Sequence, residues 1–132
     1  QHSFAALKGG AVACLSGGCV VECRGSASQT LRCSPRPRLL RCCAASPCGD
    51  FLAAGEAGSS GRGPQVLVFD LVGGGPPAVL RGHHHGVRLV AWAPSGAFLI
   101  TAGEAETDPG GHHQLLLWSW PEAERLASAH CP

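Results

Sequence analysis

The stretch LRGHHHGVRLVAWAPSGAFLITAGE, residues 80–104, decides the fold of this chain. Two apolar segments flank Pro94, Ser95 and Gly96, and a run of three histidines precedes the first segment. Proline presets φ and glycine supplies a positive φ, so this tripeptide predicts a tight turn between two antiparallel strands. The histidines could be a metal site, an expression remnant or one part of a larger pattern.

The pattern of this stretch recurs upstream. SPCGDFLAAGE, residues 46–56, aligns with APSGAFLITAGE, residues 93–104, with proline, glycine, phenylalanine and leucine in register at an offset of 47 residues. QVLVFDL, residues 65–71, aligns with HQLLLWSW, residues 113–120, at an offset of 49. GCVVEC, residues 18–23, marks a third, partial copy. The chain is therefore predicted to consist of repeats.

Each repeat contains four short apolar segments separated by turn residues. They read LLRCCAA, DFLAAGE, VLVFD and PAVLRG in the middle repeat, and VRLVAWA, AFLITAG, LLLWSW and RLASAH in the last. None of them is long and periodic enough for a helix. Four-stranded units at this interval are typical of the blades of a β-propeller.

The last repeat resembles a WD40 repeat in its Gly-His, its valine-containing strand, its Ala-Pro-Ser-Gly turn and the tryptophan of its third strand. The resemblance covers residues 39–130 well and 11–33 more loosely. It implies an all-β fold, a WD40 β-propeller fragment of about two and a half four-stranded antiparallel blades. We expect a partial blade with lost or degenerate inner strands at 1–33, and WD40 blades at 34–81 and 82–132, all within one larger propeller.

In WD40 proteins, a histidine, a serine or threonine, an aspartate and a tryptophan form a hydrogen-bonded tetrad. The resemblance places His83, Thr101 and Trp118 at three of these positions, whereas His112 stands at the aspartate position. In the middle repeat, Phe69 replaces the tryptophan, and Ser-Pro-Arg stands where Gly-His is expected. The tetrad is therefore expected to be incomplete, and the blades to depend more on packing than on this polar network.

Blade architecture explains the histidine run. His83 falls at the junction of two blades, and His84 and His85 then occupy a surface loop. Successive residues of an extended loop point in different directions, so the three side chains are not expected to bind one metal. A site shared with His112 and His113 remains an alternative on ligand identity. We predict no metal and no cofactor.

Composition excludes several classes of protein. The eight cysteines lie inside apolar runs or outside any Cys-x-x-Cys spacing, so we expect reduced thiols rather than disulfides or zinc ligands. No apolar run approaches the ~20 residues that cross a bilayer, so no membrane partner is expected. The chain lacks methionine, which predicts a piece of a longer protein. A truncated fragment without independent function is the alternative.

Charge and motifs narrow the function further. Residues 1–49 hold six basic groups against one acid, and the stretch 34–41 is either solvated or a basic patch for an acidic partner. No aromatics alternate with these basic residues, so nucleic acid is not expected. The chain has no Gly-x-Ser-x-Gly, no phosphate loop ending in Lys-Ser/Thr and no His-Glu-x-x-His. We predict that it is not an enzyme.

Finer features point to a subgroup of WD40 proteins. Ala-Gly-Glu before an inserted Gly/Ser-rich loop, a closing Trp-x-Trp and Gly-Cys-Val-Val make the chain most similar to tandem-propeller scaffolds that bind mitogen-activated protein kinases of the JNK pathway and act at centrosomes and spindle poles. EMAP-like microtubule proteins and a cilium-associated WD protein are close competitors.

This resemblance implies a non-catalytic protein-interaction scaffold that assembles signalling kinases, with a microtubule- or cilium-associated module as the alternative. The expected partners are kinases or cytoskeletal proteins, together with the remaining blades of a longer chain. The expected location is cytoplasmic, at the cytoskeleton, centrosome, spindle or cilium. The candidate protein-binding loops carry Arg36, Arg38, Arg62, His84, His85, Glu106 and Asp108.

Overall fold

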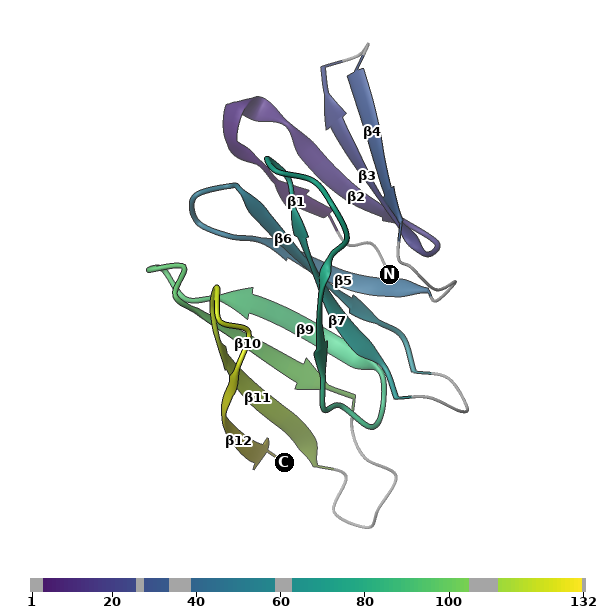
Figure 1. The fold of residues 1–132 in the computed structure, drawn as a ribbon. Helices are drawn as coiled ribbons and strands as arrows, with labels where there is room; N and C mark the ends of the chain where they lie inside the picture. Colours follow the sequence, from purple (N-terminus) through teal and green to yellow (C-terminus); the bar gives the residue numbers. More distant parts are fainter. Residues whose placement is uncertain (1–3, 26–27, 34–38, 59–62, 105–111, 132) are drawn as a thin grey trace.

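The computed structural model describes residues 4–25, 28–33, 39–58, 63–104 and 112–131. This part of the chain contains twelve β-strands, one short 3-10 turn (Lys8–Gly10) and no α-helix (Figure 1). The strands are β1 (Phe4–Ala6), β2 (Val12–Ser16), β3 (Cys19–Arg24), β4 (Ser28–Cys33), β5 (Leu40–Ala45), β6 (Phe51–Glu56), β7 (Gln65–Asp70), β8 (Ala78–Arg81), β9 (Val87–Trp92), β10 (Phe98–Gly103), β11 (His113–Ser119) and β12 (Arg125–Cys131).

The strands form three four-stranded antiparallel sheets, each a meander of consecutive strands. We call them the N-terminal sheet (β1–β4), the middle sheet (β5–β8) and the C-terminal sheet (β9–β12). The all-β prediction is confirmed. Residues 4–33 differ from the partial blade that was expected, because all four strands are present there. The inner strand β1 was missed because it is only three residues long.

Strand register matches the alignment of the two later repeats. Leu52 of β6 pairs with Phe69 of β7, and Leu99 of β10 pairs with Trp118 of β11. Each member of the second pair is the repeat counterpart of a member of the first. The middle and C-terminal sheets are therefore two copies of one structural unit.

The predicted turn around Pro94 is formed as expected. The Ala93 N–H donates to the Phe98 carbonyl at 2.9 Å, and the Gly96 N–H donates to the Ala93 carbonyl at 2.9 Å. Gly96 has a φ of 75°, and Gly49, its counterpart in the middle sheet, has a φ of 79°. Glycine is required at both turns because other residues rarely adopt this left-handed conformation.

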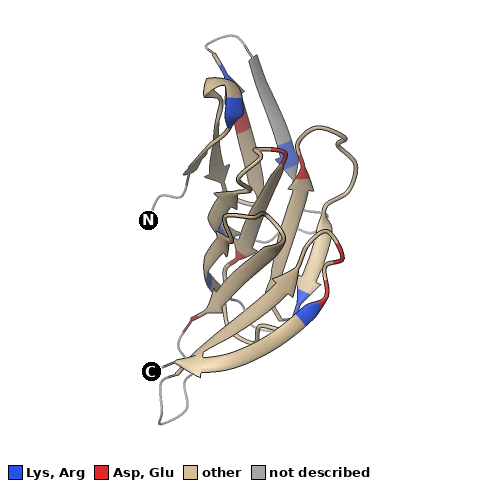
Figure 2. Cartoon of the chain, turned by 90° about the vertical axis from the view of Figure 1, so that its left-hand side faces the viewer, with Lys and Arg blue, Asp and Glu red and all other residues tan. Residues whose placement is uncertain are grey.

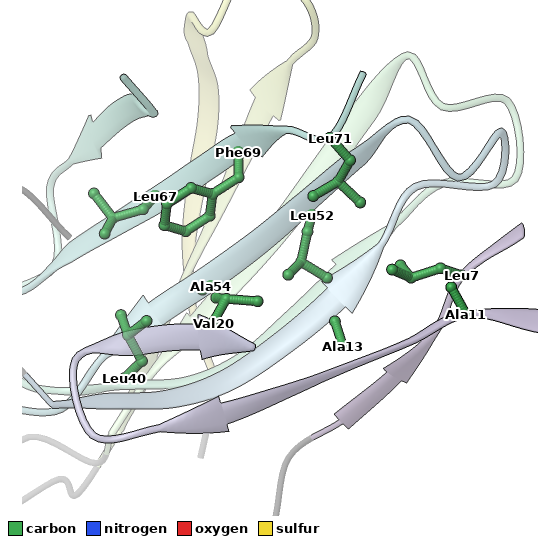
Figure 3. Close-up of a cluster of buried hydrophobic side chains, with 10 residues drawn as sticks. All are labelled: Leu7, Ala11, Ala13, Val20, Leu40, Leu52, Ala54, Leu67, Phe69 and Leu71. Atoms are coloured by element: carbon green, nitrogen blue, oxygen red, sulfur yellow. The ribbon is translucent and has the colours of Figure 1, made fainter. Parts of the chain in front are cut away.

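The three sheets stack in chain order (Figure 1). Small and medium apolar side chains fill the space between the N-terminal and middle sheets (Figure 3). This first core consists of Leu7, Ala11, Ala13, Val20, Leu40, Leu52, Ala54, Leu67, Phe69 and Leu71. A second core lies between the middle and C-terminal sheets and consists of Cys42, Ala53, Val66, Val68, Leu80, Val87, Val90, Leu99, Leu116 and Trp118.

The middle sheet is apolar on both faces. Leu52 and Ala54 of β6 contribute to the first core, whereas Ala53, between them, contributes to the second. Alternate residues of a strand point to opposite faces, so a sheet covered on both sides needs an unbroken apolar run. The run FLAAG in β6 meets this requirement.

Polar contacts also join neighbouring sheets. Arg32 of β4 donates to the Leu71 carbonyl at 3.2 Å. Trp92 of β9 donates its indole N–H to the Ala44 carbonyl at 2.9 Å. Ion pairs add to these contacts at both interfaces: Lys8 with Asp50, and Arg41 with Glu104. Charged residues are sparse and lie mostly near strand ends and turns (Figure 2).

The cysteines differ in part from expectation. Cys14, Cys23, Cys42, Cys43, Cys48 and Cys131 are free thiols. Cys19 is disulfide-bonded, which contradicts the expectation of reduced cysteines at this position. None of the helices in the described ranges is long and apolar enough to span a membrane.

Candidate interaction surfaces

The structure brings together the three side chains that the resemblance singled out. Thr101 lies in the middle of β10, and its Oγ1 accepts a hydrogen bond from the Trp118 indole N–H at 2.9 Å. The same Oγ1 lies 2.7 Å from Nε2 of His83. All three residues are buried, with exposed fractions of 0%, 4% and 4%. The threonine hydroxyl therefore links β10, β11 and the connection that precedes β9.

The histidine of this network is held neutral. Burial lowers the pKa of His83 from 6.5 to about 4, and the neighbouring Gln114 side chain opposes part of this shift. The other ring nitrogen, Nδ1, is buried without a well-formed hydrogen bond. The residue at the expected aspartate position, His112, precedes β11 and is half-buried. A buried polar atom without a partner makes the network less stabilising than a complete one.

At the described positions of this network, the middle sheet carries apolar side chains instead. Ala54 takes the position of Thr101, and Phe69 takes that of Trp118. Both belong to the first core, where Phe69 lies beside Leu67 (Figure 3). Because an apolar pair leaves no buried donor or acceptor unsatisfied, this repeat tolerates the loss of the polar network.

Three aromatic rings strengthen the contact between the middle and C-terminal sheets. The ring centroids of Phe51 and Trp120 lie 5.2 Å apart, and those of Trp92 and Trp120 lie 5.9 Å apart, both in edge-to-face geometry. Such pairs contribute about 0.5–1.5 kcal/mol beyond the area they bury. Trp120 is therefore a packing residue at the sheet interface.

Of the predicted binding loops, the structure describes the one that contains the histidine run. His84 is exposed and His85 is half-buried, whereas His83 points into the core. Arg36, Arg38, Arg62, Glu106 and Asp108 lie outside the described residues. No group of three or more metal-binding side chains occurs in the described ranges. His113 places Nδ1 3.0 Å from the Gly103 carbonyl, which engages it with the backbone.

Two basic residues at the ends of this region, Arg32 just before the stretch 34–41 and Arg41 at its end, already have partners within the fold. Arg32 contacts the buried Glu22 at 3.4 Å and the Leu71 carbonyl. Arg41 forms its ion pair with Glu104. Both guanidinium groups therefore form interactions within the fold.

One broad apolar face was not anticipated as a surface. In the C-terminal sheet, Phe98 and Ile100 are each 41% exposed and Leu89 is 53% exposed. A shallow groove of about 200 Å³ crosses this face, lined by Ile100, Leu115, Leu116, Leu117, Ala127, Ser128 and Ala129. The run LLLW in β11 is the sequence signal for it, because an unbroken apolar run indicates a strand covered on both faces.

The equivalent positions of the middle sheet are fully covered. Ala53 is the counterpart of Ile100, and Val66 and Val68 are the counterparts of Leu115 and Leu117. These three middle-sheet residues are at most 2% exposed, because the C-terminal sheet packs on them. The same positions of the C-terminal sheet thus form an open copy of an interface that the chain uses elsewhere.

Comparison with known protein families agrees with this geometry. Residues 74–119 match the WD40 family model, described as WD domain, G-beta repeat. The matched range begins before β8 and ends with β11, and it includes His83, Thr101 and Trp118. WD40 repeats generally mediate protein–protein interactions. The chain therefore contains a WD40 repeat within an all-β stack of three antiparallel sheets.

Proposed function

We propose that this chain is part of a non-catalytic scaffold that binds other proteins through the loops at the ends of its sheets. The WD40 match at residues 74–119 carries the proposal. Two continuous cores lock the sheets together, so loops such as the one with His84 and His85 are mounted on rigid supports. A preorganised loop loses little conformational entropy on binding, which favours recognition.

The specific form of the proposal is a scaffold that assembles signalling kinases of the JNK pathway at the centrosome or spindle. The resemblance of the repeats to tandem-propeller scaffolds supports this form. Its test is surface plasmon resonance between the immobilised chain and purified kinases of that pathway. Saturable binding is expected, and His84→Ala with His85→Ala should weaken it by about tenfold. Arg88→Ala is the matched control, because Arg88 is exposed on β9 outside this loop.

The alternative is a microtubule- or cilium-associated module of the EMAP-like type. Its electrostatic basis is the basic N-terminal part of the chain, but Arg32 and Arg41 are already paired within the fold. Cosedimentation with microtubules tests it, and binding through basic residues should decrease steeply with salt. Microtubule binding without kinase binding would favour this alternative. Failure of both classes to bind saturably would refute the scaffold proposal.

We further propose that the open face of the C-terminal sheet is covered by another four-stranded unit of the same kind, from a longer chain. The support is the repeat equivalence of Ile100 with the fully buried Ala53. In a longer chain that carries the next repeat, backbone amides of β11 and β12 should exchange at least tenfold more slowly than in the 132-residue chain. Equal exchange in both would overturn this part of the proposal.

A further inference from the structure

A second cavity lies at the start of β7 and the end of β8, beside the first residues of the histidine run. It has a volume of about 470 Å³ and is lined by Gly63, Pro64, Gln65, Arg81, Gly82, His83 and His84. Gln65 and Arg81 face each other across the β7–β8 ladder. The cavity therefore forms where the middle sheet ends and the chain crosses to the C-terminal sheet.

The charged side chains that line this cavity are basic. Arg81 and His84 are exposed at its rim, and none of the described residues that line it is acidic. Within the described ranges, Arg81 and Arg125 take part in no ion pair. Glu56, which pairs with Gln65 behind the cavity wall, is fully buried and accepts a hydrogen bond from the Gln65 N–H at 2.8 Å. The rim thus presents the Arg81 guanidinium, which has no ion-pair partner among the described residues.

A glycine in the cavity wall lies against an arginine of the adjacent sheet. Gly82 has a φ of 150°, and a Cβ added to it would lie 3.0 Å from Nη1 of Arg125 and 3.0 Å from Cδ1 of Leu116. The absence of a side chain at Gly82 therefore leaves room for Arg125, at the start of β12 in the adjacent sheet, beside a wall residue of the cavity. The basic side chains that line the cavity itself are those of Arg81 and His84.

We infer that this cavity, which we call the Arg81 pocket, binds an acidic side chain of a partner peptide. Guanidinium groups bind carboxylates through paired, charge-assisted hydrogen bonds. The volume exceeds that of a single carboxylate, so a short acidic segment fits. The inference rests on the proposed role as a protein-binding scaffold and names the chemistry of one partner segment.

Fluorescence anisotropy of a labelled hexaglutamate peptide tests the pocket, with hexaglutamine as the uncharged probe. The wild-type chain should bind only hexaglutamate, and Arg81→Glu should raise the Kd by about tenfold or more. Arg88→Glu, an equal charge change on exposed β9, should alter it less than about twofold. Arg81→Gln should give an intermediate loss, with unchanged circular dichroism.

If Arg81→Glu and Arg88→Glu weakened hexaglutamate binding equally, the assignment of the Arg81 pocket as the binding site would be overturned, because the peptide would then be attracted by the overall charge of the chain. Single-stranded DNA of equal charge that binds as tightly, with the same sensitivity to Arg81, would overturn the peptide assignment. Kinase and microtubule binding are measured separately on the Arg81→Glu chain. If they persist while hexaglutamate fails to bind the wild type, only the pocket inference falls and the scaffold proposal stands.

Discussion

Replacement of Thr101 by valine should lower the free energy of unfolding by about 2–6 kcal/mol. The hydroxyl is the common partner of two buried groups, the Trp118 indole N–H at 2.9 Å and Nε2 of His83 at 2.7 Å. Each group that loses its partner in the core costs about 1–3 kcal/mol. Valine has nearly the volume of threonine, so no cavity adds to this loss.

Urea denaturation followed by tryptophan fluorescence measures the change. Thr101→Ser keeps the hydroxyl and loses one methyl group, so it should cost only about 1 kcal/mol. In a Trp118→Phe background, Thr101→Val leaves one orphaned group instead of two and should cost about half as much. A loss below about 0.5 kcal/mol, or equal losses for the serine and valine variants, would refute the assignment of Thr101 as the centre of the network.

Three further predictions follow from buried groups. His83 has a pKa of about 4 in the folded chain, below its ordinary 6.5, so its imidazole binds a proton more readily in the unfolded chain. The free energy of unfolding should therefore fall by about 3 kcal/mol as pH drops from 6.5 towards 4. Urea titrations at several pH values should show a smaller fall for His83→Gln. An unchanged slope would contradict this. Gly55→Ala would place a Cβ 2.5 Å from Cγ1 of Val87 and should lower the free energy of unfolding by about 1–3 kcal/mol or more, as thermal unfolding would measure. An unchanged stability would disprove this close packing. Burial raises the pKa of the Cys42 thiol to about 11, so iodoacetamide should label the exposed Cys48 first, as peptide mass spectrometry would show; faster labelling of Cys42 would exclude this burial.

The strands of the two later sheets could be predicted closely because their signals are local. Apolar runs separated by Pro-x-Gly turns mark β5, β6, β9 and β10 to within one or two residues. The outer strand β4 reads SQTLRC and carries little hydrophobic signal. Such a strand is specified by pairing with β3, which no local pattern reveals.

The candidate site was predictable only in part. The identities of His83, Thr101 and Trp118 came from the resemblance, since nothing in their spacing alone brings them together. Their distances, and the absence of a well-formed bond at Nδ1 of His83, depend on how β10 and β11 pair. The Arg81 pocket has no sequence signature, because Gln65 and Arg81 are 16 residues apart and are brought together by the pairing of β7 with β8.

The repeat, the turn chemistry and the alternation of apolar residues could be predicted from the sequence, because they depend on the local conformational preferences of each residue. Which face of each strand is covered depends on tertiary packing. Ala53 and Ile100 occupy equivalent positions in two copies of one unit, yet the first is fully buried and the second is 41% exposed. The difference arises because a strand carries its own side-chain pattern, whereas the sheet that packs on it comes from another part of the chain.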